Sequence, residues 1–149
     1  MTVKIRRMQP ADVCDAAAIE KQIITPPWTE ADYLDALSKD SYLVLAAEDE
    51  TGKLAGYCVA SMAVDEAEII DVGVSPDRQG CGTGGRLVQE MLERLHALGI
   101  TAVFLEVREH NGPALAVYEK NGFKAVGKRK AFYSDPTEDA IIMKEETLC

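Results

Sequence analysis

Apolar and polar residues follow two different periods in the first part of the chain. Val3-Lys4-Ile5-Arg6 alternates apolar and charged residues, which predicts a short half-buried strand. Pro10-Ala11-Asp12 predicts the start of a helix, since proline suits a first helical turn and apolar residues then recur at helical spacing. Thr29, with Asp32 three residues later, is an N-cap signal for a second short helix that reaches about Leu37.

The middle of the chain predicts three consecutive strands. Runs rich in apolar and β-branched residues occupy 42–48, 54–63 and 66–74. Residues 50–53 are typical of a hairpin turn between the first two strands. The third strand ends at Ser75-Pro76-Asp77, because proline cannot donate to a strand ladder.

Helices and strands alternate in the second half. A glycine-rich loop at 80–85 precedes a helix, which carries one apolar stripe and ends at Gly99. The stripe consists of Leu87, Met91, Leu95 and Leu98. The later elements are a strand at 103–107, a helix at 113–120, and strands near 123–127 and 140–143. A meander followed by this alternation predicts an α/β (α+β) fold: one domain, residues 1–149, with a partly parallel sheet flanked by helices.

Composition narrows the class of protein. The chain has 149 residues, 47% hydrophobic and 28% charged, as ordinary globular proteins do. No apolar run approaches the roughly 18–20 residues of a membrane helix, and the N-terminus does not resemble a signal peptide, so we expect a cytoplasmic protein with no membrane contact. The net charge of −9 argues against nucleic-acid binding and favours a neutral or basic partner.

Cysteine and histidine positions indicate neither a disulfide framework nor a metal site. We expect reduced thiols, because no two cysteines form a C-x-x-C pair. His96 and His110 share no ligand spacing with cysteines or acids, so we expect no metal. The cysteines are Cys14, Cys58, Cys81 and Cys149.

The glycine-rich loop is the strongest chemical signal. Four glycines occur within six residues at a predicted helix start, where backbone N–H groups and the helix dipole attract anions such as a pyrophosphate. A flexible connector is the alternative interpretation. The loop lacks the Gly-Lys-Ser/Thr of a Walker A motif, and it does not open an N-terminal Rossmann unit.

Glu106 and Tyr118 each allow two interpretations. Glu106 places a carboxylate in an otherwise apolar strand, as an exposed or Arg108-paired residue or as a general base. Tyr118 lies one turn beyond Leu115, a spacing that usually indicates core packing. Arg129 and Lys130 are expected to be solvated.

The sequence resembles the GNAT acetyltransferases. Gln79-x-x-Gly82-x-Gly84 is similar to the Q/R-x-x-G-x-G/A signature of that family. More narrowly, the chain is similar to the bacterial ribosomal-protein-alanine N-acetyltransferases. The matching stretches are Pro27-Trp28-Thr29-Glu30, Asp65-Glu66-Ala67, Leu105-Glu106-Val107-Arg108, Asn111, Ala116-Val117-Tyr118-Glu119, Asn121-Gly122-Phe123 and Glu138-Asp139-Ala140-Ile141-Ile142-Met143.

This resemblance implies a fold and a co-substrate. The fold is a mixed sheet of about seven strands, splayed after the fourth and flanked by about four helices. The co-substrate is acetyl-CoA, and the residues implied to hold it are Val72, Gly73, Val74, Gln79, Gly80, Cys81, Gly82, Thr83, Gly84, Gly85 and Asn111. Family members often have basic residues where Gly80 and Cys81 stand, so this loop is expected to use backbone amides, with Arg86 the nearest charge.

The resemblance also assigns chemical roles. Glu106 is the implied base, and Tyr118 the implied partner of the leaving thiolate. We expect Tyr118 to act as a hydrogen-bond donor, because a tyrosine of pKa ~10 protonates a thiolate of pKa ~8.5 poorly. Cys81 has no paired histidine and is not expected to be a nucleophile.

The implied acceptor is the N-terminal alanine α-amine of a small-subunit ribosomal protein. A small-molecule or polyamine acetyltransferase and a noncatalytic acyl-CoA-binding module are the alternatives. Acidic residues of the third strand are expected to attract a basic acceptor, and the enzyme is expected to be a monomer or weak dimer. These acids are Glu66, Glu68 and Asp71. Three aromatic residues are either packing residues or walls of the acceptor groove: Trp28, and Phe132 with Tyr133 in a predicted late loop.

Overall fold

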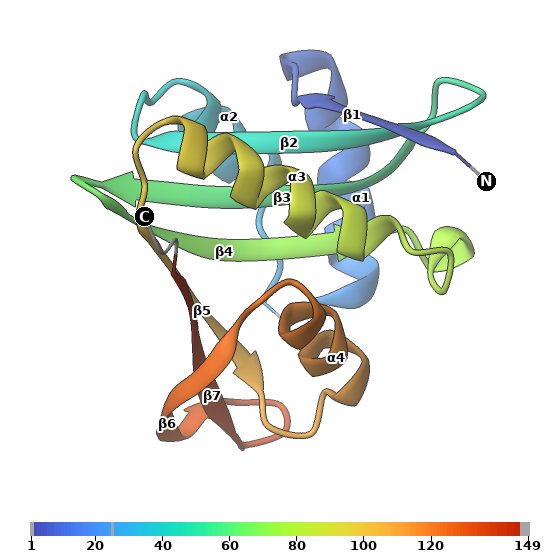
Figure 1. Ribbon diagram of the computed structural model, residues 1–149. Helices are drawn as coiled ribbons and strands as arrows, with labels where there is room; N and C mark the ends of the chain where they lie inside the picture. Colours follow the sequence, from blue (N-terminus) through green and yellow to red (C-terminus); the bar gives the residue numbers. More distant parts are fainter. Residues whose placement is uncertain (1, 25, 147–149) are drawn as a thin grey trace.

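The computed structural model describes residues 2–24 and 26–146, which form a seven-stranded sheet in the order β1-β2-β3-β4-β5-β7-β6 with helices on both faces (Figure 1). The strands are β1 (Val3–Arg7), β2 (Tyr42–Asp49), β3 (Leu54–Ala63), β4 (Glu66–Val74), β5 (Ala102–Arg108), β6 (Lys124–Tyr133) and β7 (Glu138–Glu146). The helices are α1 (Val13–Ile23), α2 (Glu30–Leu37), α3 (Thr83–Ala97) and α4 (Gly112–Lys120), with short 3-10 turns at Pro10–Asp12 and Pro76–Arg78. The mixed α/β fold is confirmed.

Three local predictions need correction. The turn at Pro10–Asp12 is a 3-10 turn, and the α-helix itself begins at Val13. Leu98 follows α3 as its C-cap and is 58% exposed, so it does not extend the buried stripe. Phe132 and Tyr133 lie in β6 rather than in a loop, because the pairing of β6 with β7 continues to Tyr133 opposite Glu138.

The sheet opens between its fourth and fifth strands. β4 pairs with β3 in antiparallel fashion along its whole length, from Glu66 to Val74. Its parallel pairing with β5 ends at Glu68 opposite Phe104, and β5 continues in partnership with β7. Figure 1 shows β5, β6 and β7 turning away from the first four strands, with α4 beside the opening. The expected splay after the fourth strand is therefore present.

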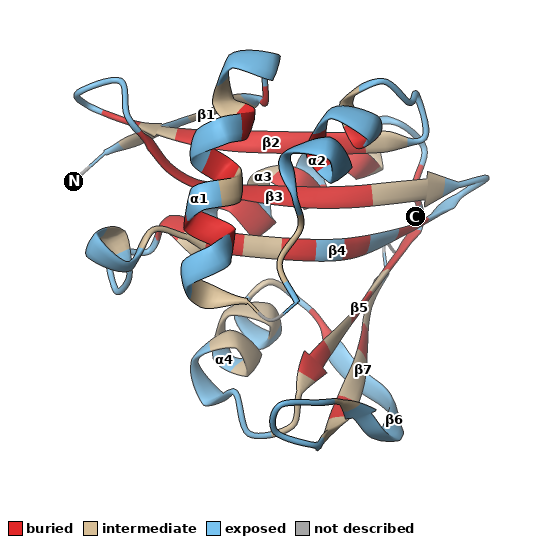
Figure 2. Cartoon of the chain, turned by 180° about the vertical axis from the view of Figure 1, so that it is seen from behind, coloured by how far each residue is buried: buried red, intermediate tan, exposed pale blue. Residues whose placement is uncertain are grey.

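Each face of the sheet has its own core (Figure 2). On one face, Leu87, Met91 and Leu95 of α3 pack with buried side chains of β2–β5 and with Phe123, which follows α4. On the other face, Tyr33 of α2 and Tyr57 of β3 are fully buried beneath α1. The two cores pack on both faces of β3, which pairs along its length with β4, the strand that borders the opening.

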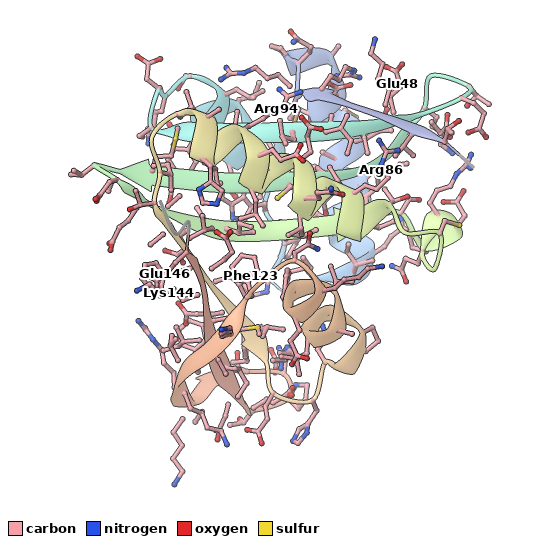
Figure 3. The ribbon with its side chains drawn as sticks, viewed as in Figure 1. Glu48, Arg86, Arg94, Phe123, Lys144 and Glu146 are labelled. Atoms are coloured by element: carbon pink, nitrogen blue, oxygen red, sulfur yellow. The ribbon has the colours of Figure 1, made fainter. Side chains whose placement is uncertain are left out.

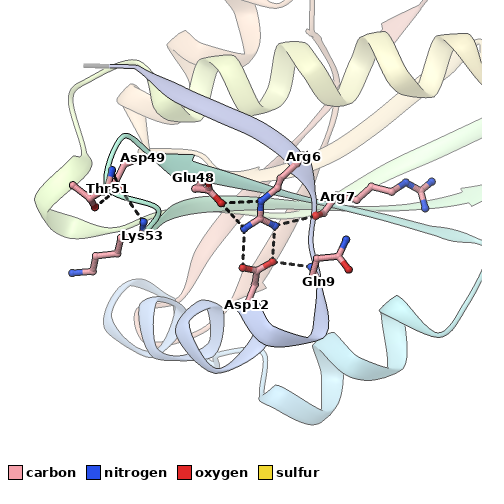
Figure 4. A network of polar contacts seen from close by, with 8 residues as sticks. All are labelled: Arg6, Arg7, Gln9, Asp12, Glu48, Asp49, Thr51 and Lys53. Carbon is pink, nitrogen blue, oxygen red and sulfur yellow. Dashed lines mark hydrogen bonds and ion pairs between the residues drawn. The ribbon is translucent and has the colours of Figure 1, made fainter.

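Polar contacts fix the start of the chain on the sheet. The Arg6 guanidinium donates to both carboxylate oxygens of Asp12, at 2.7 and 3.0 Å, and its Nε donates to Glu48 at 3.2 Å (Figure 4). The hydrogen bond from Arg6 holds the pKa of Asp12 below its usual range.

The predicted N-cap of α2 is present, since the Asp32 N–H donates to Thr29 Oγ1 at 3.2 Å. No helix among the described residues is long and apolar enough to cross a membrane.

Candidate active site

Backbone groups of β4 face the opening. The Ser75 N–H donates to the Ala55 carbonyl of β3 at 2.8 Å. Because N–H groups alternate in direction along a strand, those of Val74 and Val72 point away from β3, toward the gap that β5 leaves. The Val74 carbonyl points the same way and accepts a hydrogen bond from Gln79 Nε2 at 3.1 Å. Two strand N–H groups are thus directed into the gap.

Gly73, between these two residues, is required by close packing. A Cβ atom at this position would lie 2.2 Å from both Cζ and the hydroxyl oxygen of Tyr57, whose side chain is fully buried. A larger residue would have to displace either the Tyr57 ring or the β4 backbone. The lack of a side chain at Gly73 therefore lets β4, whose N–H groups face the gap, lie directly against the Tyr57 ring.

The glycine-rich loop ends at the N-terminus of α3, as the sequence predicts. Gly80 and Gly82 have φ values of 80° and 83°, in the left-handed region that favours glycine. Within the described chain, no side chain caps α3 at Gly82, and its first turn has no acidic residue. A Cβ added at Gly80, Gly82 or Gly85 would meet no atom of the described residues within 4 Å. The loop thus has room beside these three glycines, and the start of α3 has no side-chain cap, which suits a pyrophosphate.

Two of the residues expected to assist this loop have contacts within the chain. Arg86, at the start of α3, donates to the Val3 carbonyl of β1 at 2.8 Å (Figure 3). Asn111 is the N-cap of α4, and its Oδ1 accepts from the Ala114 N–H at 3.3 Å. Cys81 and Gln79 are exposed on the loop, and Thr83 is buried as the first residue of the helix.

Glu106 lies in β5 on the face opposite α3, because its neighbours Leu105 and Val107 belong to the α3-side core. Its side chain is 20% exposed, and Oε2 lies 3.5 Å from Nε of Arg129 on β6. Oε2 is buried and accepts no hydrogen bond from the residues the structure describes. Arg108 pairs instead with Glu138 at 3.3 Å, so the predicted alternative of a Glu106–Arg108 salt bridge is wrong. Arg129 is exposed, as expected, and in addition it contacts Glu106.

Glu106 lines a hollow of about 320 Å³ over the paired ends of β4 and β5. Glu66, Glu68 and Arg129 line the same hollow, which we call the acidic pocket. Burial raises the pKa of Glu68, the charge of Glu106 raises it further, and Arg129 opposes both effects. The pocket therefore brings together acids that lie far apart in the sequence, beside one cation.

Tyr118 packs between α4 and the α3-side core. Its ring contacts that of Phe123 edge to face, with 5.8 Å between centroids, and Figure 3 shows Phe123 between α4 and the sheet. Burial raises the pKa of Tyr118 far above its ordinary value. The phenol is therefore protonated at neutral pH and can donate a hydrogen bond.

Sequence reasoning missed a buried carboxyl pair. Glu20 of α1 is 1% exposed; it accepts hydrogen bonds from the Tyr57 hydroxyl and, at 3.2 Å, from the Trp28 backbone N–H. Asp71 of β4 is 8% exposed, and burial together with its neighbour Glu20 raises its pKa far above the usual range. Asp71 is thus neutral and buried. It cannot attract a basic acceptor, so that expectation is wrong for this residue. A carboxylate within the apolar run of β4 was the available signal.

The remaining thiols and imidazoles add no site. Cys14, Cys58 and Cys81 are free thiols, and Cys149 lies outside the described residues. Among residues 2–24 and 26–146, no group of three or more His, Cys, Asp and Glu side chains has an arrangement that could hold a metal ion. His96 contacts Glu145 through Nε2 at 2.8 Å, at the far end of α3.

The glycine-rich start of α3 follows β4, the strand after which this mixed sheet opens. The profile described as "Acetyltransferase (GNAT) family" matches residues 12–123. The chain therefore belongs to the GNAT family of acetyltransferases, which confirms the resemblance and the enzyme class.

Named relatives cover most of the chain. The ribosomal protein bS18-alanine N-acetyltransferase of Escherichia coli (strain K12) is 31% identical over 141 residues, covering 93% of this chain and 94% of the relative. The corresponding protein of Salmonella typhimurium is 33% identical over 137 residues, covering 89% of each. The crystal structure of the E. coli ribosomal-protein-S18-alanine N-acetyltransferase superposes with a TM-score of 0.90, at 30% identity, over 99% of this chain and 96% of that one.

Proposed function

We propose that this enzyme transfers the acetyl group of acetyl-CoA to the α-amine of an N-terminal alanine on a small-subunit ribosomal protein. The observation that carries the proposal is the position of Glu106. A partly buried carboxylate lines a pocket on one face of the sheet, and strand N–H groups of Val72 and Val74 face the neighbouring gap. The names of the relatives supply the acceptor class.

The cofactor half of the site uses backbone groups. We assign the thioester end of acetyl-CoA to Val72, Gly73 and Val74, and the pyrophosphate to Gln79 and the loop 80–85, namely Gly80, Cys81, Gly82, Thr83, Gly84 and Gly85. Asn111 is assigned a contact with the same cofactor. When bound, acetyl-CoA supplies the activated carbonyl that the amine attacks. The open glycine loop and the unblocked start of α3 support this assignment.

Three groups of the chain act on the reaction. An α-amine has a pKa near ~7.7–8.0, so part of it is neutral at pH 7, and Glu106 removes the remaining proton, directly or through water. The Val74 N–H donates to the carbonyl oxygen as negative charge develops there. Tyr118 donates a hydrogen bond to the departing sulfur, which its high pKa favours over outright proton transfer.

The acidic pocket also favours a second acceptor. Glu66, Glu68 and Glu106 would attract a polyamine as readily as a basic peptide, because both carry positive charge. A noncatalytic acyl-CoA-binding module would not require a general base, whereas here Glu106 lines the pocket. The cytoplasmic location, the single domain over 1–149 and the monomeric or weakly dimeric state stay predictions.

The proposal is tested with acetyl-CoA and a panel of acceptors of one basic sequence. The peptides start with alanine, with proline, or with a blocked α-amine before free lysines, and spermidine is assayed beside them. We expect the alanine peptide to have the highest kcat/KM, since its α-amine is about two pKa units less basic than a lysine amine. Preference for spermidine or for the blocked peptide would contradict the N-terminal acceptor and leave the acetyltransferase class intact.

A further inference from the structure

A buried ion pair ties the turn before the glycine-rich loop to a distant hairpin. Arg78 is the last residue of that 3-10 turn, and its Nη2 lies 2.6 Å from Oδ2 of Asp49 at the end of β2. The side chain of Asp49 is 1% exposed, and that of Arg78 is 17% exposed. Nη1 of Arg78 lies 3.6 Å from Oε1 of Glu50, so the guanidinium is directed at the turn between β2 and β3.

The two carboxylate oxygens of Asp49 have different partners. Oδ1 accepts from the Thr51 N–H, the Thr51 hydroxyl and the Lys53 N–H, at 2.9, 2.6 and 3.0 Å, and thereby closes the β2–β3 turn (Figure 4). Oδ2 accepts from Arg78. The hydrogen bond from the Thr51 hydroxyl, together with those from the backbone, holds the pKa of Asp49 below its usual range. An ionised side chain thus joins a hydrogen-bonded hairpin turn to the start of the loop.

The loop's own hydrogen bonds are local. The Arg78 N–H donates to the Ser75 carbonyl at 2.8 Å, and Gln79 Nε2 donates to the Val74 carbonyl at 3.1 Å. These bonds span only a few residues, whereas the contact of Arg78 with Asp49 spans 29. Glycines leave the backbone more conformational freedom than any other residue. A contact from outside the loop therefore matters for where the loop lies.

A backbone pyrophosphate site depends on the direction of its donors. An N–H group binds an oxygen well at about 2.7–3.2 Å, and the bond weakens steeply as its angle closes. A displacement of about 1 Å is therefore enough to weaken binding substantially. A thioester that lacks the pyrophosphate makes no such contact, so displacement of the loop should leave its binding unchanged.

We propose that Asp49 and Arg78 are positioning residues, which hold the glycine-rich loop where its N–H groups meet the pyrophosphate of acetyl-CoA. This inference rests on the proposed assignment of the pyrophosphate to residues 80–85. Arg78 acts through its contact with the hairpin turn and not as a ligand of the cofactor. The two roles have opposite consequences, because loss of the Asp49 charge would free a ligand arginine to bind phosphate more tightly.

The first test is Asp49→Asn, with CoA binding measured by calorimetric titration. Asparagine keeps an oxygen for the donors of the hairpin turn but presents an amide to Arg78, so it breaks this contact selectively. We expect the Kd for CoA to rise about tenfold. Asp35→Asn is the matched control, because it removes an exposed ion pair with Lys39 and should leave the Kd unchanged. An unchanged Kd in Asp49→Asn would overturn the inference, and a lower one would make Arg78 a ligand instead.

The second test compares two acetyl donors with the alanine-initiated peptide as acceptor. S-Acetylpantetheine carries the same thioester as acetyl-CoA but has no pyrophosphate. We expect Asp49→Asn to raise the KM for acetyl-CoA about tenfold with little change in kcat, and to leave kcat/KM for S-acetylpantetheine at its wild-type value. Equal losses with both donors would indicate a general distortion of the fold and would overturn the inference.

A double-mutant cycle supplies a third test and a second variant. Arg78→Gln leaves the turn donors of Asp49 in place, and it should weaken CoA binding as much as Asp49→Asn does. The double variant should bind CoA no more weakly than either single variant, because each change breaks the same contact. Losses that multiply would overturn the inference. A wild type that binds no CoA would contradict the proposed function, whereas wild type and variants that bind CoA equally would overturn this inference alone.

Discussion

Replacing Asp71 with asparagine should stabilise the enzyme at neutral pH, and by more as the pH rises. Asp71 is 8% exposed, and its Oδ2 accepts no hydrogen bond from the described part of the chain. Burial first, and then Glu20, raises its pKa far above the ordinary value. Asparagine keeps the shape and polarity of the protonated carboxyl but never carries a charge.

The direction in which pH changes the free energy of unfolding follows from how many protons the folded and unfolded states bind. Unfolded Asp71 loses its proton near pH ~3.9, whereas folded Asp71 keeps it through neutral pH, so the folded state binds more protons in this window. The free energy of unfolding of the wild type therefore falls by about 1.4 kcal/mol per pH unit from this one group. Over the roughly three units to pH 7 the upper limit is about 4 kcal/mol.

Urea unfolding of wild type and Asp71→Asn at pH 5, 6, 7 and 8 measures this effect. We expect the difference in the free energy of unfolding to grow by about 1 kcal/mol per unit in favour of the variant. Asp77→Asn is the control: Asp77 is exposed, and its hydrogen bond with Ser75 lowers its pKa. Its contribution is lost only as the pH falls through the lowered pKa, so its difference should be flat over pH 5–8. A flat difference for Asp71→Asn would refute the reasoning.

Other substitutions probe the site directly. Glu106→Gln should lower kcat by roughly 10²–10⁴-fold with unchanged affinity for acetyl-CoA by calorimetry; full activity at pH 7 would make Glu106 structural. Tyr118→Phe should lower kcat at least about tenfold with an unchanged circular dichroism spectrum. Acetyl-CoA should raise the Tm of the wild type but not that of Gly82→Val, because the backbone at position 82 has a φ of 83°, which valine adopts only with strain. Gly73→Ala should cost about 1–3 kcal/mol in urea unfolding, since its Cβ would lie 2.2 Å from the Tyr57 ring; an unchanged midpoint would contradict that packing.

The first four strands and their helices could be predicted closely from sequence. The bounds of β3 and β4 coincide with the predicted 54–63 and 66–74, because turn residues delimit both runs. The glycine-rich loop was predictable for a similar reason, since left-handed backbone at a helix start demands glycine at Gly80 and Gly82. Local signals were sufficient wherever local conformation sets the structure.

The later strands were harder to predict, for a physical reason. Residues 124–132 of β6 are all exposed, so no alternation of apolar and polar residues marks the strand, and only its pairing with β7 defines its length. The Arg129–Glu106 contact depends on that pairing and on the strand order, neither of which a hydrophobic period encodes. The Glu20–Asp71 pair likewise requires α1 to be packed on the sheet.

The two halves of the candidate site constrain evolution differently. The proposed cofactor half consists of backbone N–H groups and glycines, and substitutions there act on packing or strain, as at Gly73 against Tyr57. The proposed acceptor half consists of side chains that line the pocket, and one of them, Arg129, belongs to β6, which contributes no fully buried residue. Changes on β6 therefore alter pocket charge and shape at little cost in core stability. Acceptor specificity should thus vary among related enzymes through this strand, while the glycine loop and β4 stay fixed by the requirement to bind one cofactor.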